Sequence, residues 1–81
     1  MRVRLLYFAV LRDITGRNED EIDLPEGTCA TDVWNRLRAQ HSELAGYKRP
    51  PMTAINEAYV SADQTLREGD EVAFIPPVAG G

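Results

Sequence analysis

The sequence predicts an α+β fold in which a mixed β-sheet packs on one main helix. Two patterns indicate this fold class. Residues 2–8 and 71–75 alternate their side chains with the two-residue period of a strand, and residues 30–41 repeat apolar side chains at the spacing of an amphipathic helix. The predicted order is strand, strand, helix, strand, short strand, strand, which is typical of an α+β domain. A length of 81 residues leaves room for one modest core.

The first two strands are predicted to be joined by a short helix. Residues 9–14 favour this helix, and Gly16 closes it. Residues 21–24 alternate as the second strand, which is antiparallel to the first if the short helix merely bridges the pair. One face of the first strand is expected to meet the core through Val3, Leu5 and Tyr7.

The main helix is predicted over residues 30–41. Thr28 or Thr31 is the expected N-cap, although neither is followed three residues later by Glu or Gln, so a full capping box is not expected. Residues 42–51 show no clean period and predict an irregular loop. The apolar stripe of the helix consists of Ala30, Val33, Trp34 and Leu37.

The rest of the chain predicts three further strands. Residues 52–56 and 58–60 are extended and are broken near Asn56-Glu57, where asparagine adopts turn geometry more easily than most residues. Leu66 is an expected core anchor, and Gly69 begins the reversal into the last strand, residues 71–75. Val72 and Phe74 are expected on the face toward the helix.

Composition excludes several kinds of function. Nine basic residues against thirteen acidic ones give a net charge of -4, and the bases are scattered, so a nucleic acid is a poor partner. No long apolar run predicts a membrane span, and the single Cys29 cannot form an internal disulfide, so we expect a cytoplasmic protein. His41 has no second histidine or cysteine pair at ligand spacing, so no metal site is expected. A chain of this length is also too small for a deep catalytic cleft.

Apolar side chains remain on the sheet face that points away from the helix. Leu6, Phe8, Ala73 and Ile75 are expected there, and nothing else in the chain is predicted to cover them. Scattered exposed apolar residues are ordinary on small domains. Because these four converge on neighbouring strands at one end of the sheet, we favour a partner interface.

The sequence ends in an extended tail, residues 76–81, which we distinguish from the folded part, residues 1–75. Pro76 and Pro77 lack backbone N–H groups, so they stop the ladder of the last strand and launch the tail stiffly. Six residues reach at most about 20 Å when extended. Gly80 and Gly81 have no Cβ atoms and can pass through a narrow channel, so the terminal carboxylate is the predicted working group. The alternative is a frayed end.

The run from Leu66 to Gly81 closely resembles the C-terminal signature of the MoaD family, the small subunits of molybdopterin synthase. A weaker resemblance covers residues 5–12 and Ile55-Asn56, and the length and element order agree over essentially the whole chain. The family consists of ubiquitin-like sulfur carriers with the β-grasp fold. The resemblance therefore implies a β-grasp domain over residues 1–75.

The resemblance also implies a chemical role for the tail. In such proteins a ubiquitin-activating-type enzyme uses ATP to adenylate the terminal glycine, which becomes a thiocarboxylate and donates its sulfur to cyclic pyranopterin monophosphate inside the large synthase subunit. By position, Gly81 carries the sulfur, and the threaded tail includes Gly80, Ala79 and Val78. Partner contacts fall on Phe8, Arg12, Ile75, Pro76 and Pro77; an aromatic residue is expected where Ile75 stands. The family implies a heterotetramer with the large subunit and no cofactor bound by this chain.

Four alternatives stay open. A related carrier could serve thiamine or another thio-cofactor pathway, and a ubiquitin-like modifier could end in the same Gly80-Gly81 pair. Cys29 is a rival sulfur carrier because a thiol near a helix N-terminus can be reactive, although a lone cysteine is usually a buried small hydrophobe. Arg12 could equally be a plain solvated charge. On none of these interpretations is the chain an enzyme by itself.

Overall fold

The computed structural model describes residues 1–47 and 50–75. Within these residues, five strands, two α-helices and one 3₁₀ turn follow the predicted order. The elements are β1 (Arg2–Tyr7), α1 (Val10–Thr15), β2 (Glu19–Asp23), α2 (Ala30–Gln40), η1 (Ser42–Leu44), β3 (Met52–Ile55), β4 (Ala58–Val60) and β5 (Glu71–Ile75). The short helix α1 ends at Gly16, whose φ of 74° is open to glycine without strain, as predicted.

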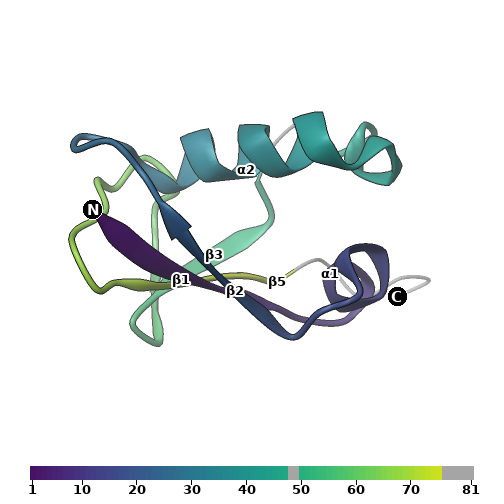
Figure 1. Ribbon diagram of the computed structural model, residues 1–81, viewed down its shortest axis with the longest axis horizontal. Coiled ribbons are helices and arrows are strands. Elements are labelled where there is room, and N and C mark those ends of the chain that lie inside the picture. The colour runs from purple at the N-terminus through teal and green to yellow at the C-terminus, as the bar shows by residue number, and fades with distance from the viewer. Residues whose placement is uncertain (48–49, 76–81) are drawn as a thin grey trace.

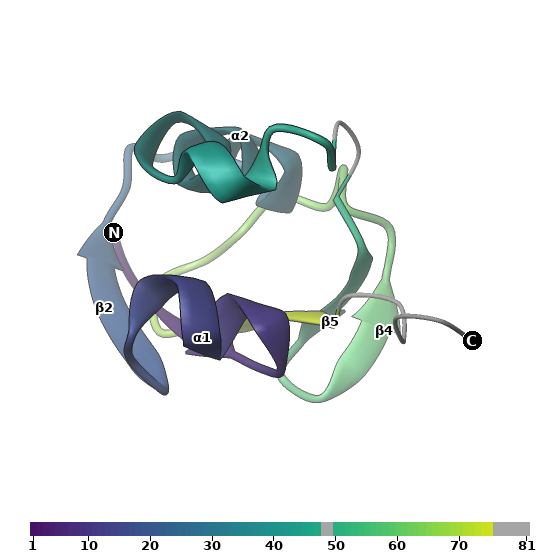
Figure 2. The same cartoon turned by 90° about the vertical axis from the view of Figure 1, so that its right-hand side faces the viewer.

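The five strands form one mixed sheet in the order β2-β1-β5-β3-β4. The first and last strands, β1 and β5, pair in parallel at its centre, and the other three pairs are antiparallel. The helix α2 lies across one face of the sheet, and α1 lies beside the end where β1 finishes (Figure 1, Figure 2). The predicted mixed sheet on one main helix, and the antiparallel pairing of the first two strands, are therefore confirmed.

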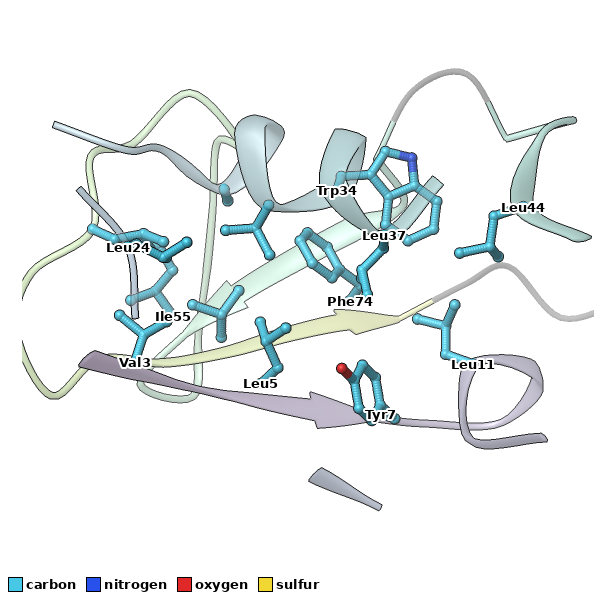
Figure 3. Close-up of a cluster of buried hydrophobic side chains, with 14 residues drawn as sticks. Val3, Leu5, Tyr7, Leu11, Leu24, Trp34, Leu37, Leu44, Ile55 and Phe74 are labelled. Atoms are coloured by element: carbon cyan, nitrogen blue, oxygen red, sulfur yellow. The ribbon is translucent and has the colours of Figure 1, made fainter. Parts of the chain in front are cut away.

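The core lies between α2 and the sheet, where its two largest fully buried side chains, Trp34 and Phe74, lie against each other (Figure 3). Their ring centroids are 5.1 Å apart with the planes tilted by 60°, a favourable aromatic geometry. The buried Trp34 indole N–H donates a hydrogen bond of 2.9 Å to the carbonyl of Tyr47, so its polar atom is satisfied. The predicted core residues Val3, Leu5, Tyr7, Ala30, Val33, Trp34, Leu37, Leu66, Val72 and Phe74 are all buried.

The strand β2 begins at Glu19, two residues before the predicted start. Its acid-rich sequence gives little strand signal, but opposite charges on neighbouring strands stabilise a pair. Arg2 contacts Glu21 and Asp23 at 3.4 and 3.1 Å, and Arg4 contacts Glu19 at 3.5 Å. This edge strand is therefore matched to β1 by charge.

The start of α2 differs from the prediction. Cys29 is the N-cap, and its backbone N–H donates a hydrogen bond of 3.0 Å to the Asp32 carboxylate, in the manner of a capping box. The Thr28 hydroxyl instead donates to the carbonyl of Pro25, and the Thr31 hydroxyl donates to the carbonyl of Ala62. Both predicted caps are wrong because their hydroxyls serve the flanking loops. The predicted loop after α2 contains η1, which buries Leu44.

Candidate functional site

The sheet face opposite α2 carries a continuous row of apolar residues. The pairing register aligns Leu6 with Ala73, Ala73 with Ala54, and Ala54 with Tyr59. Because side chains alternate along a strand, all four point away from the core that α2 covers. In the next row, Ile75 pairs with Met52, and Phe8 directly follows β1. We call this set the apolar face: Leu6, Phe8, Met52, Ala54, Tyr59, Ala73 and Ile75.

The apolar face is open to solvent at its margin and closed at its centre. Tyr59, Met52 and Phe8 are 66%, 57% and 44% exposed, whereas Ala54 and Ala73 are buried. These alanines form the floor of a groove of about 250 Å³, which Glu57 and Glu71 also line. The structure places Leu6, Phe8, Ala73 and Ile75 on the face away from α2, as predicted. Ala73 is nevertheless buried, because larger neighbours screen it from solvent. Exposed aromatic and thioether side chains around an apolar groove are typical of a docking surface.

The predicted interface residues Phe8 and Ile75 lie at the same end of the sheet. Tyr7 pairs with Phe74 in the parallel register of β1 and β5, so the next positions are Phe8, directly after β1, and Ile75, the last residue of β5. Arg12 is exposed on α1, and it lines a second hollow of about 390 Å³ together with Leu6 and Phe8. Phe8 therefore lines one hollow with Ile75 and another with Arg12. Pro76, Pro77, Val78, Ala79, Gly80 and Gly81 lie outside the described residues.

A strained turn positions Phe8 relative to Arg12. Ala9 has φ 49° and ψ -124°, a conformation that L-residues rarely adopt. The Leu11 N–H donates a hydrogen bond of 3.0 Å to the carbonyl of Phe8 and so closes the turn into α1. Strain of this kind is often found at functional sites, where the surrounding structure holds it in place.

Three members of the apolar face were not predicted from the sequence. Met52 and Ala54 alternate with the buried Thr53 and Ile55, and this alternation was the available signal. Tyr59 could not be assigned to a face without the register of the β3–β4 hairpin. The structure therefore widens the predicted surface from β1 and β5 to four strands.

Cys29 lies far from this surface. It is half-buried at the start of α2, at the end of the molecule where β1 and β5 begin, whereas Ile75 lies where they finish (Figure 1). Its thiol donates to the Asp32 carboxylate at 3.4 Å. Cys29 is thus near a helix N-terminus, as expected, but is not buried as a small hydrophobe would be.

The described part of the chain has two further properties that bear on function. No three His, Cys, Asp or Glu side chains in residues 1–47 and 50–75 gather as a metal site would require. Within the same residues, no helix combines the length and the apolar character needed to cross a bilayer. The apolar face is the candidate site, because exposed aromatic and thioether side chains surround an apolar groove there.

A mixed five-stranded sheet that holds one main helix in this topology defines a β-grasp protein of the ubiquitin-like type. The ThiS family model matches residues 5–81, and the chain belongs to the ThiS family. Among its relatives, the molybdopterin synthase sulfur carrier subunit of Chlamydomonas reinhardtii is 36% identical over 100% of both chains. The subunit of the same name from Homo sapiens is 36% identical over 99% of this chain and 94% of its own.

Solved structures show the same fold. A Pyrococcus furiosus protein provisionally named molybdopterin converting factor subunit 1 has a TM-score of 0.82 and 32% identity, covering 96% of this chain and 99% of its own. A chain in the Helicobacter pylori complex of subunits 1 and 2 of molybdopterin-converting factor has a TM-score of 0.66 and 21% identity, covering 100% of both chains. The second likeness supports the fold alone.

Proposed function

We propose that this chain is the sulfur carrier of a molybdopterin synthase and that the Gly81 carboxylate carries the sulfur. The observation that carries the proposal is the position of Phe8 and Ile75 on the apolar face, because Ile75 directly precedes residues 76–81 in the chain. The family membership and the name shared by the relatives support the same role. A protein docked on this face would meet the start of the tail at Ile75.

The proposed chemistry explains why a separate activating enzyme is needed. An α-carboxyl group has a pKa of about 3.3 to 3.7, so near pH 7 it is an anion that resists nucleophilic attack. Transfer of AMP from ATP to the Gly81 carboxylate, with loss of pyrophosphate, makes an acyl-adenylate. A sulfur nucleophile then displaces AMP and leaves a thiocarboxylate. We assign the first step to a ubiquitin-activating-type adenylyltransferase, which consumes the ATP.

The thiocarboxylate is proposed to donate its sulfur to cyclic pyranopterin monophosphate within the large synthase subunit. Gly80, Ala79 and Val78 would thread into that subunit, while Phe8, Arg12, Ile75, Pro76 and Pro77 would contact it. The name of the relatives, molybdopterin synthase sulfur carrier subunit, supports a partner of this kind, and a protein of the same fold is paired with subunit 2 in the Helicobacter pylori complex. We further propose a heterotetramer, a cytoplasmic location and no cofactor bound by this chain.

The name of the relatives favours the molybdopterin pathway over thiamine or another thio-cofactor. Copurification of the large molybdopterin synthase subunit from the same organism tests this choice. Recovery of a different large subunit instead would assign the carrier to another pathway, and isopeptide-linked adducts in cell extracts would indicate a protein modifier.

The chemistry is tested by intact-mass spectrometry after incubation with the activating enzyme, ATP and a sulfur source. Replacement of one oxygen by sulfur at the terminal carboxylate raises the mass by about 16 Da, whereas the carboxylate persists without activation because it is a poor electrophile. Omission of ATP is the control. An unchanged mass with an enzyme preparation that modifies another carrier would contradict the proposal.

A further inference from the structure

The β3–β4 hairpin carries a residue that the fold disfavours. Its two turn residues, Asn56 and Glu57, have φ values of 52° and 70°. A two-residue hairpin with both φ values positive prefers Asn followed by Gly, since the second position strains any residue with a Cβ. Asn56 is well suited, because its side-chain amide donates to Asp70 at 2.9 Å and its side-chain carbonyl accepts the Glu71 N–H at 3.0 Å. Glu57 stands where glycine is the natural choice.

The Glu57 side chain has no ion-pair partner among the described residues, and it is exposed. The other carboxylate at the apolar groove differs, because Glu71 contacts the Arg4 guanidinium at 3.3 Å. Glu57 therefore strains the turn and gains no counter-charge from the described part of the fold. Residues that break a local rule without structural compensation are candidates for function.

Glu57 stands at the junction of two surfaces. It lines the apolar groove with Tyr59, and it also lines a charged hollow of about 500 Å³ with Arg2 and Arg4. In and beside this charged hollow, six carboxylates accompany the two arginines: Glu19, Glu21, Asp23, Glu57, Glu68 and Glu71. The excess of four negative charges equals the net charge of -4 of the whole chain, so the remaining charges balance.

We propose that Glu57 is a specificity-determining residue of the apolar face, where its carboxylate pairs with a lysine or arginine of the docked partner protein. The inference rests on the proposed function, because that partner is the large synthase subunit. An apolar centre with negative charge on one flank is complementary to an apolar surface with positive charge beside it. Because the exposed Arg12 lies beyond the other end of the groove, opposite charges at the two ends would also fix the orientation of the partner.

The test measures the affinity of the full chain for the large subunit from the same organism, by calorimetry at low and high salt. We compare Glu57→Gln, Glu57→Lys and Glu57→Gly with a matched charge reversal, Glu26→Lys, in the turn between β2 and α2. At low salt we expect binding about 3-fold weaker for Glu57→Gln and about 10-fold weaker for Glu57→Lys, with smaller losses at high salt. Glu26→Lys should bind nearly as the wild type does.

The Glu57→Gly variant separates recognition from folding. It should raise the melting temperature, because glycine relieves the strained φ, and yet it should weaken binding as Glu57→Gln does. If Glu57→Lys binds no more weakly than Glu26→Lys, the inference is overturned while the proposed function stands. The inference would also be overturned if the wild-type chain acquired the thiocarboxylate, with its mass increase of about 16 Da, but self-associated through Phe8 instead of binding the large subunit. Absence of both the mass change and the binding would reject the proposed function itself.

Discussion

Cys29 shows how one residue serves the fold at the end of the molecule away from the apolar face. As N-cap of α2 it supplies a backbone N–H to Asp32, while its thiol donates to the same carboxylate at 3.4 Å. A thiol is a weak hydrogen-bonding group, and serine is among the preferred N-caps. The cap is therefore a position where the sequence falls short of the best local choice.

Replacing Cys29 with serine should stabilise the protein. We expect the free energy of unfolding to rise by about 0.5 to 1 kcal/mol, because the hydroxyl oxygen is a better acceptor for the first helical N–H groups. Urea denaturation measures this change, with Cys29→Ala as the control that lacks a capping atom. Both variants should still acquire the terminal sulfur. Loss of thiocarboxylation in both would move the chemistry to Cys29.

At the scale of elements, β1 and β2 are joined by a side-chain bridge on the helix side of the sheet. The Tyr7 hydroxyl donates to the Asp20 carboxylate at 3.4 Å, and Asp20 also contacts Arg17 at 3.2 Å. Burial, followed by the negative charge of Asp20, raises the pKa of Tyr7 from 10 to about 12. The fold therefore favours the neutral phenol.

This shift makes the strand pair sensitive to alkali. Because the pKa of Tyr7 is higher in the folded state than in the unfolded state, its contribution to stability is complete below pH 10 and is lost as the pH rises toward about 12. Urea denaturation at several pH values should show the free energy of unfolding falling over this interval, and less steeply in Tyr7→Phe. The control is Tyr59→Phe, which removes an exposed hydroxyl. Equal slopes for all three proteins would contradict the assignment.

The sequence predicted those elements whose periodicity is set by burial. The strands β1 and β5 face α2, so core-facing residues alternate along them: Val3, Leu5, Val72 and Phe74. The predicted bounds of both strands lie close to the observed ones. The start of β2 was missed because Glu19 is held by charge, and the Cys29 cap was missed because cysteine is not a usual N-cap. In the candidate site, Phe8 and Ile75 followed from alternation. Tyr59 and Glu57 depended on a hairpin register and a positive φ, neither of which composition reveals.

At the scale of the whole molecule, folding and sulfur transfer are expected to depend on different parts of the chain. Deleting Gly81 should abolish thiocarboxylation, since the carboxylate would move to Gly80 and miss the activating site by one residue. The melting temperature should stay nearly unchanged because a terminal glycine has no side chain to bury. Mass spectrometry and thermal denaturation on the same sample measure both effects. A large fall in melting temperature would indicate a structural role for the tail.

The parallel pairing of β1 with β5 has a consequence for biosynthesis. Arg4 and Glu71 are neighbours in the sheet although 67 positions separate them along the chain. The nascent polypeptide cannot close its core on the ribosome until Glu71–Ile75 has been made, since β1 and β3 would lack the strand that lies between them. A prematurely terminated product would expose these strand edges and be open to proteolysis. Proteolysis would therefore remove most of the chains that end before Ile75, in which the surface shared by Phe8 and Ile75 is incomplete.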